Sequence, residues 1–315
     1  MKKVFFLILI FMSGICVKAN PISILTDSIQ PDKARITKDL KFLIKSPIAR
    51  SNEHVERLNE CANYILEEFK KLTDVVEEQK YLVNGKEYKN IICSFGPADG
   101  ARIIVGAHYD VCDEQPGADD NASGVAGLLE TARLVKSQGG NLKYRIDFVA
   151  YSLEEPPNFR TENMGSAVHA KMLHDNQIKV KRMICLEMIG FYSNKRGSQE
   201  YPIGLMRLFY PGKANYIAVV GKFGQGKTLR KTKKAMKGNS DIKVCSINAP
   251  AVIPGIDFSD HLNYWKYGYS AVMITDTSFY RNANYHEKTD TLETLNIDKM
   301  VEVVKGVYAS IVTLN

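Results

Sequence analysis

The chain has 315 residues, of which 45% are hydrophobic and 24% are charged, with 42 basic against 35 acidic residues. This composition is that of an ordinary globular protein long enough for one large core, and it excludes a largely disordered chain. The net charge is +7, and without Lys2, Lys3 and Lys18 of the first 19 residues it is +4, which is mild and gives little reason to expect a nucleic-acid partner. The basic residues between positions 227 and 237 are typical of a solvated helix face.

The first 19 residues have the organisation of a secretory signal peptide. Two lysines precede an apolar run over residues 4–12, and Val17-Lys18-Ala19 supplies the cleavage positions. Cys16 raises the alternative of a lipoprotein signal, but the preceding Ile15 is too large for that processing. The apolar run is shorter than the roughly 20 residues of a membrane span, and no later segment offers one. We therefore expect residues 1–19 to be removed and residues 20–315 to be exported, to the periplasm or beyond, without stable membrane insertion.

Hydrophobic periodicity predicts alternating helices and strands along the rest of the chain. Helices are expected near residues 36–44, 55–72, 120–136, 167–174 and 297–312. Strands are expected at residues 81–83, 88–95, 103–107, 144–153, 182–190, 216–220 and 271–274. The pattern predicts one α/β domain with a mixed, mostly parallel central sheet flanked by helices. Residues 190–215 and 242–263 look long and irregular, and such loops usually shape a binding site.

A histidine and a pair of aspartates follow the strand expected at residues 103–107. His108 would emerge at the carboxyl end of this strand, where open α/β sheets place their active sites. Asp119 and Asp120 open the next helix, close to its positive end. A helix cap explains one aspartate and not two. These residues are therefore candidate metal ligands, although a capping aspartate and a core histidine would also fit the pattern.

Carboxylates follow two further strands. Glu154 and Glu155 are adjacent at the end of the strand expected at residues 144–153, and their mutual repulsion would be offset by a divalent cation. Glu187 stands alone inside an apolar run, where a charge is costly unless it is paired or bound to metal. His286 lies in a polar loop before the last helix and is a weak candidate on its own.

Together these residues resemble peptidase family M28, a family of zinc aminopeptidases, along nearly the whole mature chain. The resemblance is carried by His108-Tyr109-Asp110, Gly117 to Gly124, Glu154-Glu155-Pro156-Pro157, Phe159-Arg160-Thr161, Met164-Gly165-Ser166, Glu187 to Ser193, Phe258-Ser259-Asp260-His261, Tyr285-His286 and Asp290-Thr291. It implies a single-domain zinc-exopeptidase fold with two zinc ions about 3.5 Å apart. It also implies that His108 and Glu187 bind one zinc, that Glu155 and His286 bind the other, and that Asp120 bridges them.

The same resemblance makes Glu154 the general base and Asp110 the carboxylate that orients His108. Nitrogen and oxygen ligands suit zinc, and Glu154 would take a proton from the attacking water and return it to the leaving amine. One ion can also hold the free α-amine of a peptide. We therefore expect peptide substrates and the activity of an aminopeptidase.

Two alternatives remain open at this point. Gly221 to Thr228 matches the phosphate-binding loop of nucleotide-binding proteins, follows an expected strand and precedes a lysine-rich helix. Within the same fold, a glutaminyl-cyclase-like enzyme would keep a single working zinc and turn an N-terminal glutamine into a ring.

Some properties are left undetermined by the sequence. The resemblance assigns no role to Cys112, Asp260, His261 or Asp276. Export would permit disulfides, but the pairing of the five mature cysteines stays open because an odd number leaves at least one free. The preferred N-terminal residue, the peptide length and the oligomeric state are not predicted.

Overall fold

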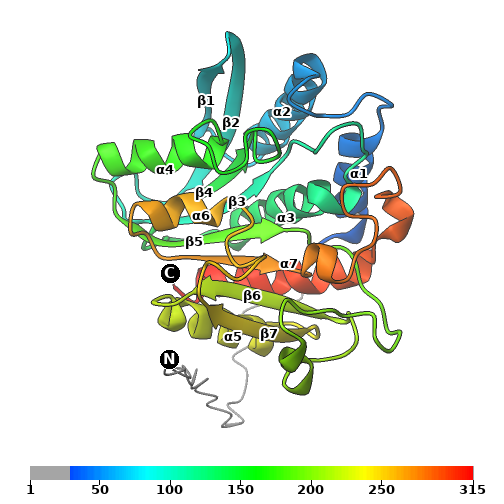
Figure 1. The fold of residues 1–315 in the computed structure, drawn as a ribbon. Helices are drawn as coiled ribbons and strands as arrows, with labels where there is room; N and C mark the ends of the chain where they lie inside the picture. Colours follow the sequence, from blue (N-terminus) through cyan, green and yellow to red (C-terminus); the bar gives the residue numbers. More distant parts are fainter. Residues whose placement is uncertain (1–28, 315) are drawn as a thin grey trace, which may run out of the picture.

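The computed structural model describes residues 29–314, and an eight-stranded sheet runs through their centre (Figure 1). The strands are β1 (Val76–Val83), β2 (Lys86–Phe95), β3 (Arg102–His108), β4 (Arg145–Tyr151), β5 (Val180–Glu187), β6 (Tyr216–Lys222), β7 (Lys243–Ala249) and β8 (Ala271–Thr275). Their order is β1-β2-β4-β3-β5-β8-β6-β7. Strands β4, β3, β5 and β8 are parallel, while β2 and β6 flank them in the opposite direction. The expected mixed, mostly parallel sheet is confirmed.

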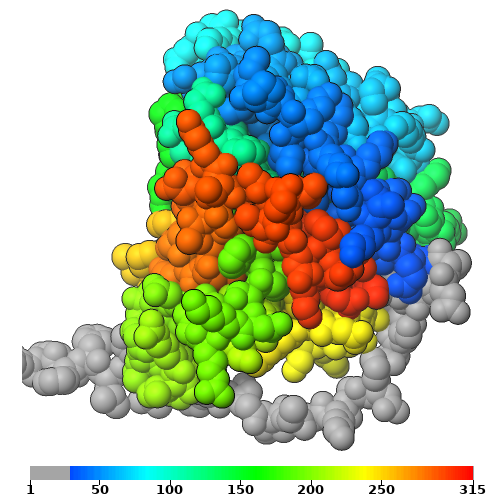
Figure 2. All heavy atoms as spheres, turned by 90° about the vertical axis from the view of Figure 1, so that its right-hand side faces the viewer, coloured from blue at the N-terminus to red at the C-terminus, as the bar shows by residue number. Residues whose placement is uncertain are grey.

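Helices cover both faces of this sheet. They are α1 (Lys33–Ile44), α2 (Val55–Lys70), α3 (Gly124–Gln138), α4 (Gly165–Asp175), α5 (Gly226–Asn239), α6 (His261–Lys266) and α7 (Ile297–Val312), with short helical turns η1 (Ala118–Ser123), η2 (Gly204–Leu208), η3 (Ser278–Tyr280) and η4 (Leu292–Thr294). Helices α1, α2, α3, α5 and α7 share one apolar core with the sheet, and α4 and α6 share a second core on the other face. Helix α1 (blue) lies against α7 (red), as Figure 2 shows.

The parallel strands bring four connecting segments to one edge of the sheet. Residues 103–108 of β3 are all buried, as expected for a central strand with helices on both faces. The register pairs His108 with Tyr151 at the end of β4, and Glu187 with Thr275 at the end of β8. The loops that follow β3, β4, β5 and β8 therefore lie side by side.

The expectation of an irregular segment over residues 242–263 is wrong in part. This segment contains β7 and the start of α6. Strand β7 is an edge strand in which only Val244 and Ala249 are buried, so it lacks the apolar run by which β3 was predicted. Residues 190–215 are irregular apart from η2, as predicted. Within residues 29–314 the structure contains no helix long and apolar enough to cross a membrane.

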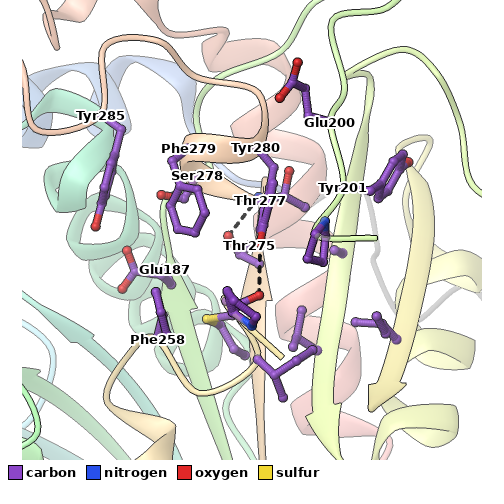
Figure 3. A pocket seen from close by; sticks show the side chains of 18 of the residues that line it. Glu187, Glu200, Tyr201, Phe258, Thr275, Thr277, Ser278, Phe279, Tyr280 and Tyr285 are labelled. Atoms are coloured by element: carbon purple, nitrogen blue, oxygen red, sulfur yellow. Dashed lines mark hydrogen bonds between the residues drawn. The ribbon is translucent and has the colours of Figure 1, made fainter. Parts of the chain in front are cut away.

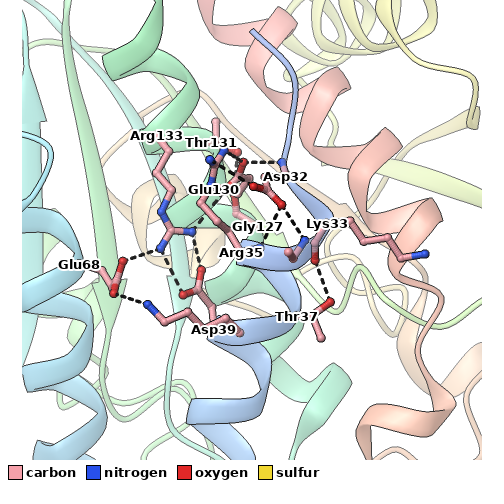
Figure 4. A network of polar contacts seen from close by, with 12 residues as sticks. Asp32, Lys33, Arg35, Thr37, Asp39, Glu68, Gly127, Glu130, Thr131 and Arg133 are labelled. Atoms are coloured by element: carbon pink, nitrogen blue, oxygen red, sulfur yellow. Dashed lines mark hydrogen bonds and ion pairs between the residues drawn. The ribbon is translucent and has the colours of Figure 1, made fainter. Parts of the chain in front are cut away.

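A buried ion-pair network joins α1, α2 and α3 (Figure 4). Arg133 of α3 donates to Asp39 of α1 at 2.6 Å and to Glu68 of α2 at 2.8 Å. Glu130 lies one turn before Arg133, and its carboxylate accepts two hydrogen bonds, of 2.6 and 2.9 Å, from the Arg35 guanidinium of α1. Because the carboxylates of Asp39 and Glu130 are fully buried, their charges depend on these arginines.

Candidate metal centre

The loops at the carboxyl edge of the sheet bring all six predicted metal-site and catalytic residues into one cluster. His108 ends β3, Asp120 lies in η1, Glu154 and Glu155 follow β4, Glu187 ends β5, and His286 lies in the loop after β8. All of them except His286 are more than nine-tenths buried. Segments separated by nearly 180 positions in the sequence therefore form one polar centre.

The Asp120 carboxylate lies between the two imidazoles. Its Oδ1 atom is 3.5 Å from His108 Nε2, and its Oδ2 atom is 3.2 Å from His286 Nε2. Each histidine also faces one glutamate, since Glu187 Oε2 is 3.3 Å from His108 Nε2 and Glu155 Oε2 is 3.3 Å from His286 Nε2. The geometry thus contains a His108 position (His108, Asp120, Glu187) and a His286 position (His286, Asp120, Glu155).

The charges of this cluster fit metal cations. Burial raises the pKa of Glu155 to about 8, and it also raises the pKa of Glu154 and of Glu187. Burial acts against the charge of His286, but Asp120 and Glu155 outweigh it and raise the pKa of that imidazole to about 10. Glu155 Oε1 and His286 Nε2 are buried without a hydrogen-bond partner among the described residues. Divalent ions would neutralise the carboxylates and use these free donor atoms.

Glu154 has a different place from Glu155. Its Oε2 atom is 3.9 Å from His108 Nε2, farther than the oxygens of Asp120 and Glu187 that face the same nitrogen at 3.5 and 3.3 Å. The Asp110 carboxylate accepts the backbone N–H of Glu154 at 3.1 Å and that of Glu155 at 3.0 Å, and its Oδ1 atom is 3.4 Å from His108 Nδ1. One aspartate therefore holds the backbone of both glutamates and lies next to the His108 imidazole.

The backbone around the cluster adopts uncommon conformations. Leu153 (φ 60°), Met188 (φ 47°) and His286 (φ 59°) are in the left-handed region, which is disfavoured for side chains of this kind. Leu153 immediately precedes the glutamate pair, and Met188 immediately follows Glu187. The strained residues therefore lie where the chain turns from a strand to present a polar side chain.

Sequence reasoning missed the residues that hold η1 in place. Asn121 Oδ1 accepts the N–H of Met188 at 3.0 Å, and Asn121 Nδ2 donates to Leu186 O at 2.9 Å. Asp290 accepts the N–H groups of Asp119 and Asp120 at 2.9 and 3.0 Å. The motif residue Asp290 was quoted only as part of the resemblance, and its contacts are with backbone atoms that no side-chain pattern reveals.

Arg50 is a second residue that the sequence did not reveal. This arginine is 2% exposed and donates to the carbonyls of Tyr109 (2.8 Å), Pro116 (2.5 Å) and Gly117 (2.6 Å). Burial lowers its pKa. It closes the loop that joins His108 to Asp120. Gly117 (φ 60°) suits the tight end of this loop, because a Cβ there would lie 2.2 Å from Asp120 O.

An apolar cavity of about 260 Å³ opens beside the cluster (Figure 3). One end is lined by Asp120, Glu154, Glu155, Glu187 and His286. The rest is lined mainly by aromatic and aliphatic side chains, including Phe159, Tyr201, Met206, Tyr210, Tyr216, Val220, Ile247, Phe258, Met273, Phe279 and Tyr285. Figure 3 shows Tyr285 and Glu187 on one side of this space and Tyr201 on the other. The cavity can hold a molecule with one polar and one apolar end.

The Gly221 to Thr228 motif does not form a phosphate-binding loop. Gly221 and Lys222 still belong to β6, where they pair with Asn248 and Ala249 of β7. Gln225 N donates to Lys222 O at 3.0 Å and closes a tight turn directly before α5. A phosphate cradle needs a wide loop of successive backbone N–H groups, and this turn leaves no room for one.

The buried histidines and carboxylates at the carboxyl ends of parallel strands form a candidate metal site in an α/β fold. The sequence profile of Peptidase family M28 matches residues 90–311. The Escherichia coli (strain K12) protein YfbL, described as uncharacterized, is 47% identical over 281 residues, which make up 87% of this chain and 85% of YfbL. The chain belongs to peptidase family M28, and it is a metallopeptidase.

More distant relatives agree with this family. Leucine aminopeptidase 1 of Ajellomyces capsulatus (strain G186AR) is 26% identical over 228 residues, covering 69% of this chain and 53% of that protein, so the chain spans about half its length. LapB from Legionella pneumophila has a TM-score of 0.71 at 25% identity, over 90% of this chain and 72% of that one. A glutaminyl cyclase from Porphyromonas gingivalis, with a TM-score of 0.65 at 17% identity over 91% and 99%, shares the fold alone. Family and relatives support a zinc aminopeptidase in general terms.

Proposed function

We propose that the protein is a two-zinc aminopeptidase that removes apolar residues from the N-termini of peptides. The observation that carries this proposal is the Asp120 carboxylate, whose two oxygens face His108 and His286 at 3.5 and 3.2 Å. A bridging carboxylate with one histidine and one glutamate on each side is the ligand set of a dinuclear site.

In the proposed reaction, water and a peptide give a free amino acid and a peptide shorter by one residue. Two bound zinc ions would supply Lewis acidity to the scissile carbonyl and lower the pKa of the attacking water. Glu154 takes a proton from this water and transfers it to the leaving amine. Asp110 keeps Glu154 in place by accepting its backbone N–H, and it orients His108.

The apolar cavity supports a substrate with a large apolar N-terminal side chain. The acidic end of the cavity would attract the free α-amine, and the aromatic walls would bury the side chain. Phe258 lies between Phe159 and Phe279, with ring centroids 6.0 Å away in both cases, so the wall beside the cluster is a packed aromatic surface. Charged N-terminal side chains would lose their hydration there without gaining a partner.

A panel of aminoacyl arylamides tests this proposal. We expect hydrolysis of leucyl, methionyl and phenylalanyl substrates and little hydrolysis of aspartyl or lysyl substrates. N-acetylation of the best substrate should abolish its hydrolysis, because the amine would be blocked. Equal turnover of free and acetylated substrates would contradict the assignment as an aminopeptidase.

The same assay separates the peptidase from a glutaminyl cyclase. If the enzyme hydrolyses the first peptide bond of a glutaminyl peptide, it is a peptidase. If the peptide loses ammonia and its peptide bond stays intact, the enzyme is a cyclase. Donors on both sides of Asp120, with His108 and Glu187 on one side and Glu155 and His286 on the other, favour the two-metal peptidase.

We also propose that the enzyme works outside the cytoplasm on peptides rather than on nucleic acid. The support is the signal-like pattern of residues 1–19, which lie outside the described residues. N-terminal sequencing of the protein secreted by an expressing bacterium should begin at Asn20. Recovery of intact Met1 in the cytoplasmic fraction alone would contradict export.

A further inference from the structure

Cys112 lies beside the His286 position and is not among the metal ligands expected from the sequence. Its Sγ atom and ligand atoms of Glu155 and His286 all lie within 4.8 Å of one another. Cys112 is 8% exposed, so its side chain is largely shielded from solvent. Five free cysteines lie in the described chain, and in the metal-ligand groups found among residues 29–314 the cysteine is Cys112.

Neighbouring atoms also indicate a ligand at this point. Glu155 is 5% exposed, and its Oε1 atom has no hydrogen-bond partner among the described residues. The same is true of His286 Nε2. His286 Nε2 has only ion-pair contacts with Asp120 and Glu155, and Glu155 Oε1 stays unpaired beside the thiol, which is costly for a buried carboxylate oxygen unless a further partner binds it.

The chain around Cys112 is held firmly. Val111 N donates to Arg50 O at 3.2 Å, and the Arg50 guanidinium holds Pro116 O and Gly117 O on the far side of the loop. The backbone on both sides of Cys112 is therefore held by the buried arginine. A chain held in this way loses less conformational entropy when its thiol binds a metal ion.

We propose that Cys112 is a fourth protein ligand of the His286 position, in addition to Glu155, His286 and the bridging Asp120. This inference rests on the proposed two-zinc function. Zinc with sulfur at about 2.3 Å and nitrogen or oxygen at about 2.0 Å brings its donors about 3.3–3.6 Å apart. Glu155 Oε2 and His286 Nε2 already have such a separation at 3.3 Å, and Cys112 Sγ lies within 4.8 Å of the ligand atoms of both residues. On binding, the S–H bond breaks, a zinc–sulfur bond forms, and the proton leaves to solvent.

The consequence is that the two metal positions differ in chemistry. The His108 position offers only nitrogen and oxygen donors, whereas the His286 position gains a soft sulfur donor. The His286 position should therefore bind zinc more tightly and take up a thiophilic ion such as Cd²⁺ first. Loss of the thiol should weaken this one position and leave the other unchanged.

Cobalt substitution tests the proposal with a readout other than activity. The metal-free protein loaded with two equivalents of Co²⁺ should show a near-ultraviolet charge-transfer band from thiolate to cobalt. Cys112→Ser should lose this band, and Cys245→Ser should keep it, because Cys245 lines the apolar cavity on β7. We expect Cys112→Ser to raise the zinc dissociation constant of the His286 position by at least about 10-fold. This is the smallest effect seen when a residue that only supports a metal ligand is lost.

A second measurement uses the parent protein alone and so does not depend on the folding of a variant. Alkylation of Cys112 by iodoacetamide, followed by mass spectrometry, should be slow without metal, because the thiol is buried and burial raises its pKa to about 12, and slower still with zinc, while Cys245 should react at similar rates in both states. A two-cobalt protein without the band, or equal alkylation of Cys112 with and without zinc, would overturn the proposal. If the parent protein binds two metal ions and hydrolyses peptides but shows neither the band nor the protection, the Cys112 proposal is wrong and the proposed function still holds. If the parent protein binds no metal, the proposed function itself is wrong.

Discussion

Glu154 and Glu155 are neighbours in sequence, yet their carboxylates have different surroundings. Glu155 Oε2 faces His286 Nε2 at 3.3 Å, whereas Glu154 Oε2 stands 3.9 Å from His108 Nε2. We predict that Glu154→Gln keeps both zinc ions and lowers kcat by roughly 10² to 10⁴-fold, the range for loss of a positioned general base. KM should change little. Steady-state kinetics together with metal analysis of the purified variant measure both quantities.

Glu155→Gln is the matched control for this prediction. It makes the same chemical change one residue away, at a carboxylate that is proposed to be a zinc ligand. Zinc content should therefore fall in Glu155→Gln and not in Glu154→Gln. The opposite pattern would reverse the two roles, and unchanged turnover in Glu154→Gln would remove the proposed general base.

At the scale of single residues, the sequence predicted the side chains that form the polar cluster. It missed the side chains that bind backbone atoms around the cluster. His108, Glu155 and Glu187 could be found because each ends or follows a buried strand. Arg50 could not, because its partners are the carbonyls of Tyr109, Pro116 and Gly117, and a carbonyl has no signature in the sequence.

The loop between β3 and η1 is the element on which the metal centre depends most. It joins His108 to Asp120, and Arg50 binds three of its carbonyls. We predict that Arg50→Lys weakens zinc binding by about 10 to 100-fold, as expected for a supporting residue, because lysine cannot reach three carbonyls at once. Competition with a fluorescent chelator measures the two dissociation constants.

Arg133→Lys provides a comparison for the loop prediction. Arg133 is also a buried arginine, but it lies in the ion-pair network of α1, α2 and α3. Its substitution should lower stability without changing zinc affinity in the protein that remains folded. Equal zinc affinity in the Arg50→Lys and Arg133→Lys variants would show that Arg50 supports the fold and not the metal centre.

The elements that the sequence missed lie where burial is incomplete or a helix is very short. Strand β1 was expected only at residues 81–83, because in β1 only Val83 is buried and no apolar run marks its start. Strand β7 is also an edge strand, and α6 has only six residues, which is too short for a helical period. The central strands were predicted because two covered faces demand continuous apolar sequence.

At the scale of the whole molecule, the network around Arg133 holds three helices together over the sheet. We predict that Arg133→Met lowers the free energy of unfolding by about 3–5 kcal/mol, because it removes the cation from the fully buried Asp39 carboxylate, whereas Glu130 keeps Arg35 and Glu68 keeps Lys71. Urea denaturation of the metal-free protein measures this change.

Lys33→Met serves as the surface control. Lys33 pairs with Asp298 at 2.6 Å, but both side chains are more than half exposed, so the loss should stay below about 1 kcal/mol. Equal losses in the two variants would contradict the role given to burial. The network could not be predicted from the sequence, since its members lie up to 98 positions apart and only the packing of α1, α2 and α3 brings them together.

The central claim is that Asp120 bridges two working metal positions. Zinc titration of the metal-free enzyme tests it most directly, with bound zinc measured by mass spectrometry and peptide hydrolysis measured at each step. We predict that binding saturates at two zinc ions per chain and that full activity needs both, with His108→Ala and His286→Ala each retaining at most one tightly bound ion. Full activity at one zinc ion per chain would contradict the account.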